Sequence, residues 1–371
     1  MKGYIPTLDG WRAIAILGVI LHHVTVSFVY PDGPFPNARA LGISRALGDW
    51  GVEIFFAISG FLICTRLLQE REQTGEIGLK SFYLRRAFRI LPPYFLYLAV
   101  LGVIAFVGLA QVEAKEWWGC ALFVRNYLTA PTPPFTGWYT GHFWSLSVEE
   151  HFYLFWPLLL VICGNKRARI VVVVLALIIM LWRTLDERLE LVQIGHITHR
   201  TDTRIDGLLW GCWAALLLAV PAYKSWITQW FSVWIWLGVS GLLVVMSRYS
   251  HTVEMAAKPF FLPWLLLGTI LHPTTLFSRV LELGPVRWIG KVSYSLYLWQ
   301  QLFLMGSMKV TRPFPMGWLQ ELPLNVMAAF ACAMASYYIV ERPVLRLGQR
   351  ITARLVPHAK PAGVAAPAPR M

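Results

Sequence analysis

Ten apolar stretches, of which those near 168, 204 and 259 are short for a membrane span, constrain the fold of this chain more than any other feature of its sequence. A helix needs roughly 17–25 predominantly apolar residues to cross a bilayer. Stretches of about this length lie near residues 11–30, 50–68, 88–110, 143–163, 168–183, 204–220, 230–248, 259–273, 290–308 and 321–345. Charged residues make up 14% of the chain, against about 25% in a soluble domain. The sequence therefore predicts an all-α, polytopic membrane protein with about ten transmembrane helices.

Lysine and arginine residues predict the orientation of these helices. If the N-terminus is cytoplasmic, the segments on its side hold 20 basic residues and the opposite loops hold 12. Because basic residues are retained on the cytoplasmic side, we expect both termini there, and the net charge of +13 then needs no nucleic-acid partner. We expect one membrane-embedded domain over residues 1–345. A basic, then Ala/Pro-rich cytoplasmic tail over 346–371 is expected to be disordered.

Few features outside the apolar stretches indicate structure. In the long loop 111–142, Trp117-Trp118 favours a helix at the membrane interface, and the Pro/Thr-rich stretch 129–136 favours a rigid turn. The five cysteines are isolated and form no CxxC or Cys/His cluster. Neither a disulfide framework nor a metal site is indicated.

The first apolar stretch contains two ionisable side chains on one helix face. Arg12 and His23 are eleven residues apart, which is about three helical turns plus roughly 20°, whereas His22 points elsewhere. Ionisable side chains in hydrocarbon are costly and indicate a functional site by default. The structural alternative is that Arg12 reaches the interface while the histidines hydrogen-bond neighbouring helices. Asp9 and the polar groups elsewhere in the chain favour function.

Two arginines lie at the start of the third apolar stretch, at the cytoplasmic end that the charge pattern predicts. Arg86 and Arg89 are spaced i and i+3, so they share a helix face and can bind phosphate oxygens with paired N–H groups. A plain positive-inside anchor is the alternative.

The stretch from Phe143 begins with paired carboxylates, Glu149 and Glu150. Ser145, Glu149 and Tyr153 recur at intervals of four residues, which predicts one polar stripe on an apolar helix. The alternative is that acidic groups merely suit a helix N-terminus.

Three later segments add polar residues to predicted spans. Residues 201–207 contain two acids and an arginine, for which an ion pair is as good an explanation as substrate binding. Residues 293–300 place hydroxyl groups along the ninth span, and 337–343 end the last span with tyrosines. Interfacial tyrosines are common without any function.

Together these segments resemble the acyltransferase-3 family of integral membrane O-acyltransferases, over roughly residues 4–345. The segments that carry the resemblance, in the order of the family, are LDGWRAIAILGVILHH, FFAISGFLI, RRAFRILPPY, FWSLSVEEHFYLFWP, TRIDGLLWG, GKVSYSLYLWQ and YYIVERP. The resemblance implies that a sugar-bearing acceptor, such as a polysaccharide or lipopolysaccharide O-antigen, is acylated. No C-terminal esterase domain of the SGNH type, which some members carry, is expected.

The resemblance also implies roles for individual residues. Arg12 and His23 match the catalytic R-x10-H pair of the family, and Arg86 and Arg89 match its RxxR pair, which is associated with the acyl-CoA donor. The chain departs from the family pattern at His151, where glutamine is common, and at Gln300, where histidine is common. These departures put specificity in doubt more than the core chemistry, since Glu149, Glu150 and Tyr297 are retained.

Acyl transfer to a hydroxyl group needs a base, charge stabilisation and a held donor. We expect His23 to deprotonate the acceptor or to carry the acyl group transiently, with Arg12 stabilising negative charge. We expect catalytic roles for Arg12, His23, Glu149 and Glu150, acyl-CoA binding by Arg86 and Arg89, and substrate binding by Asp9, Ser147, Tyr153, Arg204, Asp206, Tyr297 and Trp299.

The expected co-substrate is acyl-CoA, with acetyl-CoA as the expected donor, and no metal is expected. The expected location is the bacterial inner membrane. The competing function is a transporter or flippase for a glycan or lipid, since several spans with internal polar groups also suit a carrier.

Overall fold

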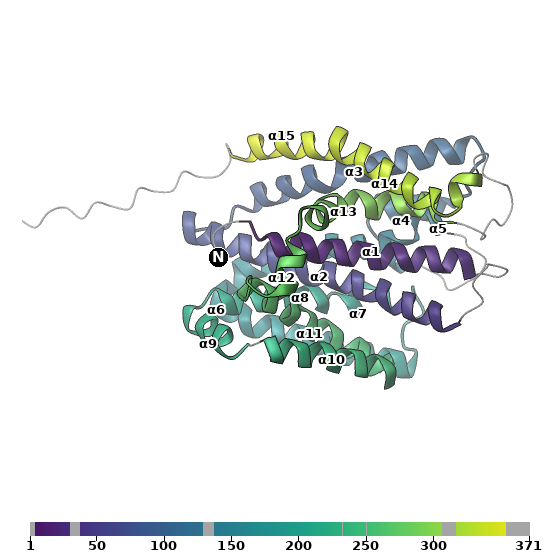
Figure 1. Cartoon of the computed structure of the whole chain (residues 1–371). Helices are drawn as coiled ribbons and strands as arrows, with labels where there is room; N and C mark the ends of the chain where they lie inside the picture. The colour runs from purple at the N-terminus through teal and green to yellow at the C-terminus, as the bar shows by residue number, and fades with distance from the viewer. Residues whose placement is uncertain are drawn as a thin grey trace, which may run out of the picture.

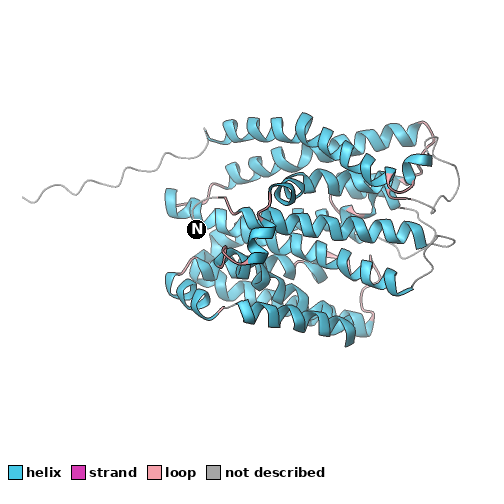
Figure 2. Cartoon of the chain, in the orientation of Figure 1, coloured by secondary structure: helices cyan, strands magenta, loops and turns pink. Residues whose placement is uncertain are grey.

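The computed structural model describes residues 4–29, 38–128, 137–231, 233–249, 251–305 and 317–353. Helices account for all regular structure within these ranges, and they lie side by side as a bundle (Figures 1 and 2). The main helices are α1 (Pro6–Val29), α2 (Ala38–Thr74), α3 (Leu79–Phe106), α6 (Phe143–Leu189), α8 (Asp206–Leu218), α10 (Val233–Tyr249), α11 (His251–Leu271), α13 (Gly284–Phe303), α14 (Leu324–Ser336) and α15 (Arg342–Ala353). Shorter elements are α4 (Ala114–Ala121), η1 (Arg125–Tyr127), α5 (Trp138–Gly141), α7 (Thr201–Arg204), α9 (Pro221–Trp230), α12 (Leu276–Leu281), η2 (Gly317–Gln320) and η3 (Tyr337–Glu341).

The described helices identify a multi-pass membrane protein. Five helical segments are long and apolar enough to cross a bilayer, and α8 with α9, which meet at 105°, form a sixth candidate. Large apolar side chains face outward, for example Ile162 at 80% exposure, as lipid contact requires. The all-helical prediction is confirmed, whereas ten spans and the cytoplasmic side of the termini are not.

Helix α6 contains two antiparallel segments. At 1.5 Å per residue, the 31 positions from His151 to Trp182 would cover about 46 Å if the helix were straight. However, His151 hydrogen-bonds Thr201 at 2.6 Å, while Trp182 hydrogen-bonds the next residue, Asp202, at 2.8 Å. Gly164 breaks the helix with φ +66° and ψ 168°, a backbone conformation that favours glycine. The predicted stretches 143–163 and 168–183 therefore fold back on each other within one element.

The connection between the second and third predicted spans is short. Helix α2 continues to Thr74 and α3 begins at Leu79, so Arg86 and Arg89 lie within α3 and not in a loop. Helix α15 likewise continues to Ala353, past the expected boundary at 346, and residues 354–371 lie outside the described ranges. A short helix, α4, does contain Trp117-Trp118, while 129–136 lies outside the described ranges.

Helix α1 packs against α2 and α13. Small residues allow these close approaches: a Cβ on Gly290 would lie 1.8 Å from the carbonyl oxygen of Asp9. Helix α2 meets α8 in the same way, because a Cβ on Gly60 would lie 2.0 Å from the carbonyl oxygen of Leu208. Small-residue contacts of this kind are typical of helix packing in membranes. The described ends of the chain, at α1 and α15, lie at the same end of the bundle (Figure 1).

Candidate active site

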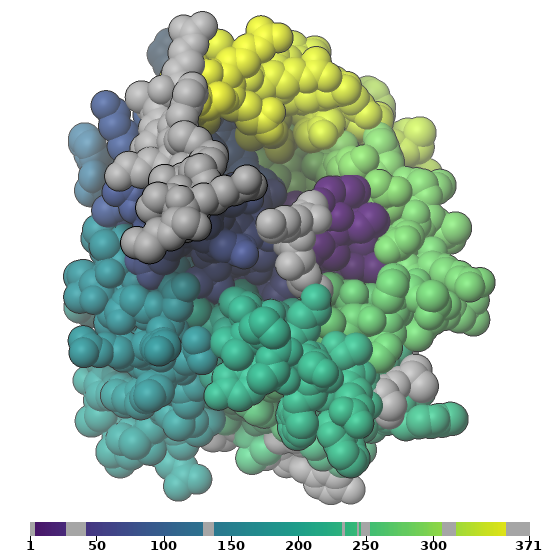
Figure 3. Space-filling model, turned by 90° about the vertical axis from the view of Figure 1, so that its left-hand side faces the viewer, coloured from purple at the N-terminus to yellow at the C-terminus, as the bar shows by residue number. Residues whose placement is uncertain are grey.

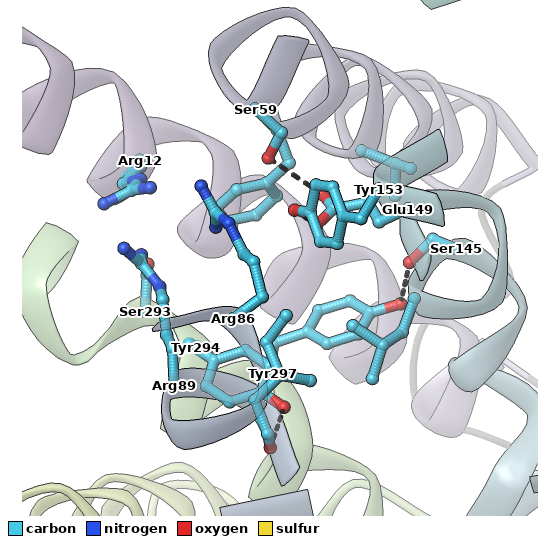
Figure 4. A pocket seen from close by; sticks show the side chains of 14 residues that line it. Arg12, Ser59, Arg86, Arg89, Ser145, Glu149, Tyr153, Ser293, Tyr294 and Tyr297 are labelled. Carbon is cyan, nitrogen blue, oxygen red and sulfur yellow. Dashed lines mark hydrogen bonds between the residues drawn. The ribbon is translucent and has the colours of Figure 1, made fainter. Parts of the chain in front are cut away.

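A cavity of about 670 Å³, including its open mouth, lies among α1, α2, α3, α6 and α13. Its lining combines charged groups, hydroxyl groups and a few apolar side chains (Figure 4). The lining residues are Arg12, Val52, Phe55, Ser59, Arg86, Arg89, Ile90, Ser145, Leu146, Glu149, Tyr153, Ser293, Tyr294 and Tyr297. We call this space the arginine cavity.

Three guanidinium groups from two helices approach the arginine cavity. Arg12 comes from α1, and Arg86 and Arg89 come from α3 (Figure 4). Arg12 forms a loose ion pair with Asp9, with 3.8 Å between nitrogen and oxygen, and neither Arg86 nor Arg89 has a carboxylate partner among the described residues. Positive charge that lacks an internal partner is suited to a phosphate-bearing ligand.

Glu149 faces these arginines from α6. Its carboxylate accepts hydrogen bonds from Ser59 at 3.1 Å and from the Tyr153 hydroxyl, which lies on the same helix. Cζ of Arg86 lies 4.8 Å from the centroid of the Tyr153 ring. Ser145, Glu149 and Tyr153 therefore line one cavity, as their spacing predicts, and hydrogen bonds hold Glu149 in place.

Arg66 belongs to the same group, although we did not predict it. Its charge interacts with those of Arg12, Arg86 and Arg89. Arg66 and Arg12 both line a second opening, which also contains Tyr4 and Asp9. The sequence does carry a signal, because Arg66 is a charged residue inside the end of the apolar stretch 50–68. Figure 3 shows this end of the molecule, where blue surface lies deep between the yellow C-terminal helix and the purple N-terminal residues.

The structure does not place His23 in the arginine cavity. Its ring lies beside the Gln300 side chain and 5.7 Å from the Trp138 ring, centroid to centroid, so it faces other helices. Nδ1 of His23 is enclosed and has no hydrogen-bond partner. Since α1 is continuous between them, Arg12 and His23 are separated by roughly 16 Å along the helix axis. His23 therefore does not line the arginine cavity, and its catalytic role stays a prediction.

Tyr297 stands between the arginine cavity and the surroundings of His23. Its hydroxyl hydrogen-bonds Ser145 at 2.6 Å and donates to the carbonyl oxygen of His142. The Tyr297 ring lies 5.3 Å from the His142 ring, centroid to centroid. His142 is a second buried histidine that we did not predict, because a lone histidine before an apolar stretch has no spacing pattern to reveal it.

Several predicted site residues lie outside the arginine cavity. Ser147 donates to the carbonyl oxygen of Phe143 at 3.0 Å within its own helix. Trp299 is buried with its ring 5.6 Å from that of Tyr97. Glu150, adjacent to Glu149, has one oxygen that is enclosed without a partner. Of the two glutamates that we expected to be catalytic, only Glu149 lines the arginine cavity.

Arg204 and Asp206 lie in a separate buried network of ion pairs. Arg204 pairs with Glu53 at 2.8 Å, and Asp206 receives two hydrogen bonds from Arg183, each of 3.1 Å. All four side chains are at most 2% exposed. The ion-pair explanation that we left open for residues 201–207 therefore describes this geometry, and substrate binding by Arg204 and Asp206 has no support from it.

Two stacked aromatic rings lie beside Arg204 of this ion-pair network. Cζ of Arg204 lies 5.6 Å from the centroid of the Trp144 ring, and the His199 ring stacks on the same tryptophan at 4.5 Å. Burial, followed by the neighbouring charges of His196 and Arg204, lowers the pKa of His199 to about 3. This imidazole is therefore neutral at physiological pH.

Within the described ranges, no group of three or more His, Cys, Asp or Glu side chains is arranged to hold a metal ion. The five cysteines, Cys64, Cys120, Cys163, Cys212 and Cys332, are free thiols.

The sequence of this chain is similar to those of known proteins. A family model described as an acyltransferase domain matches residues 5–342. The chain is 26% identical over 381 residues to the peptidoglycan O-acetyltransferase OatA of Listeria monocytogenes, an alignment that covers 94% of this chain and 57% of that protein. It is 27% identical over 374 residues to the O-acetyltransferase OatA of Staphylococcus aureus, with 93% and 58% covered. The chain thus spans little more than half the length of these relatives, and no solved structure matches it.

Proposed function

Because the chain belongs to the acyltransferase-3 family, we propose that it is a membrane-bound O-acyltransferase. It moves an acetyl group from acetyl-CoA to a hydroxyl group of a polysaccharide acceptor. The observation that carries this proposal is the convergence of Arg12, Arg86 and Arg89 on one cavity, opposite a fixed carboxylate, Glu149.

The arginines supply what a coenzyme A ester requires. The pyrophosphate and phosphate groups of the donor are anionic, and guanidinium groups bind such oxygens with paired N–H groups. Arg66 extends the positive charge toward the second opening. The arm of coenzyme A that carries the thioester is a long flexible chain. Phosphates bound near Arg89 and a reacting carbonyl near His23 are therefore compatible with one bound molecule.

The acyl transfer step needs a base for the acceptor hydroxyl group. We assign this role to His23, since a neutral imidazole can accept a proton near physiological pH. The hydroxyl oxygen bonds to the acyl carbon as its proton moves to His23. The bond between that carbon and sulfur then breaks, and the thiolate leaves with the proton that His23 returns. Arg12 and Glu149 would act at the donor end of this path.

The relatives favour an acceptor of the peptidoglycan type over an O-antigen, because one of them is named for peptidoglycan. We place the arginine end of the bundle at the cytoplasmic face of the bacterial inner membrane, where acetyl-CoA is made. The opposite end, near α5, would then face the acceptor outside the cytoplasm.

Purified full-length protein in lipid nanodiscs tests this function against the transporter alternative. With acetyl-CoA and a soluble muropeptide, an acetyltransferase releases free thiol and an acetylated muropeptide in equal amounts, as thiol titration and mass spectrometry would show. A carrier would instead move the glycan across proteoliposomes unchanged, without releasing thiol, and that result would refute the proposal.

Replacing Arg89 with alanine is expected to raise the KM for acetyl-CoA by roughly 10- to 100-fold, since a hydrogen bond to a charged group contributes about 1.5–3 kcal/mol. The KM for the muropeptide should change little, because Arg89 lies at the donor end. Arg350→Ala is the matched control, since Arg350 lies exposed on α15 at the same end of the bundle. Equal increases in both KM values for Arg89→Ala would contradict phosphate binding by this residue.

A further inference from the structure

Four side chains meet beyond Tyr297, on the side away from the arginine cavity. His23 lies beside Gln300, 5.7 Å from the Trp138 ring, centroid to centroid, and near His142. We call His23, Trp138, His142 and Gln300 the histidine cluster. The indole N–H of Trp138 donates a hydrogen bond of 2.8 Å to the backbone carbonyl oxygen of Gln301, and this bond holds α5 against α13.

The histidine cluster contains polar atoms that lack well-formed hydrogen bonds. These atoms are Nδ1 of His23, both imidazole nitrogens of His142, and both amide atoms of Gln300. His142 is 4% exposed and Gln300 is fully buried. The His142 ring interacts with the Leu298 backbone and Gln300 with His23, but neither contact has the geometry of a full hydrogen bond. Buried polar groups in native proteins are nearly always paired. Five such atoms in one place therefore indicate that a ligand supplies the missing partners.

The chemistry of these atoms favours hydroxyl groups over anions. A neutral imidazole and an amide each offer both a donor and an acceptor, as a sugar hydroxyl group does. Arg125, whose charge reaches His142, is already paired with Glu116 at 3.0 Å. The unpaired arginines instead lie in the arginine cavity. The two ends of the site thus differ in the ligands that they suit.

Helices α1 and α13, which pack against each other, both extend from the arginine cavity to the histidine cluster. Arg12 and Ser293 line the arginine cavity from these two helices, and Tyr297 lines it one turn further along α13. Gln300, about one more turn on, lies beside His23. The cluster lies toward the end of the bundle where α5 is found, away from the N-terminus (Figure 1). An acyl group held by a donor in the cavity would pass the Tyr297 ring to reach this cluster.

We propose that the histidine cluster is the acceptor subsite, in which His142 and Gln300 hold sugar hydroxyl groups so that one of them faces His23. This inference rests on the proposed acetyltransferase function. His142 is here a residue that binds and positions the acceptor, while His23 takes the proton of the reacting hydroxyl group. The ligand class is an uncharged, hydroxyl-bearing carbohydrate unit.

His142→Ala and Gln300→Ala test the subsite in full-length protein in nanodiscs, with acetyl-CoA and a muropeptide as substrates. Each variant is expected to raise the KM for the muropeptide by about 10-fold or more, because hydrogen bonds to the acceptor are lost. The KM for acetyl-CoA should stay within about twofold of the wild-type value. His272→Gln is the control. His272 directly follows the last residue of α11, and its ring hydrogen-bonds the backbone carbonyl oxygen of Phe231, outside the histidine cluster.

Different results separate the possible failures. An unchanged KM for the muropeptide in both variants, or an equal rise in both KM values, would overturn the acceptor subsite. Wild-type protein that releases no thiol would instead overturn the proposed function itself. If His142→Ala does not fold, as judged by its thermal unfolding, Gln300→Ala provides the same test from α13.

Discussion

His23→Ala is expected to abolish acetyl transfer while the protein still inserts and folds. Removing a general base costs about 10²- to 10⁴-fold in rate, and removing an acyl carrier stops turnover altogether. The change leaves the packing of α1 nearly intact, because the ring lies at the edge of the core and makes no well-formed hydrogen bond through Nδ1. Thiol release and acetylated muropeptide measured in nanodiscs provide the test.

His22→Ala is the matched control for this experiment. His22 adjoins His23 in the sequence but packs on α2, where a Cβ on Gly48 would lie 2.7 Å from the His22 Cβ. Its removal should leave the transfer rate near the wild-type value. An active His23→Ala protein would rule out both roles that we assign to this residue.

The base and carrier roles of His23 can also be distinguished. Protein incubated with radiolabelled acetyl-CoA without acceptor, then quenched with acid, would keep label on His23 only if the residue carries the acyl group. Label that is absent from the wild-type protein, together with normal turnover, would identify His23 as the base.

Arg204→Met is expected to destabilise the fold by about 3–5 kcal/mol, which is typical when one partner of a buried ion pair is removed. The variant leaves the Glu53 carboxylate, 1% exposed, without its guanidinium partner. A lower midpoint of thermal unfolding in detergent would report this loss. The double variant Glu53→Gln with Arg204→Met should recover part of the stability, because the uncompensated charge is gone.

Lys115→Met is the control for this stability prediction. Lys115 pairs with Glu113 at 2.7 Å, but the two side chains are 60% and 46% exposed. Exposed ion pairs contribute about 0–1 kcal/mol, so unfolding should change little. If Arg204→Met were as stable as Lys115→Met, the network at Glu53 would not stabilise the fold, and substrate binding by Arg204 would regain support.

Much of the arginine cavity could be predicted because its features are local. Ser145, Glu149 and Tyr153 share a face through helical periodicity alone, and Arg86 and Arg89 share one for the same reason. The resemblance to a family added the roles of Arg12 and His23. Two functional candidates escaped prediction, since Arg66 reads as one more basic residue at the end of a span and His142 has no spacing partner.

The sequence by itself determined that the chain is helical, that it is apolar enough for a membrane, and that it carries ionisable groups on particular helix faces. These properties depend on residue type and on a period of 3.6 residues, both of which are local. Only the tertiary structure decided that Tyr297 separates Arg12 from His23, that His142 meets His23, and that Arg204 pairs with Glu53. The physical reason is that periodicity fixes the direction in which a side chain points, whereas the packing of distant helices fixes what lies there.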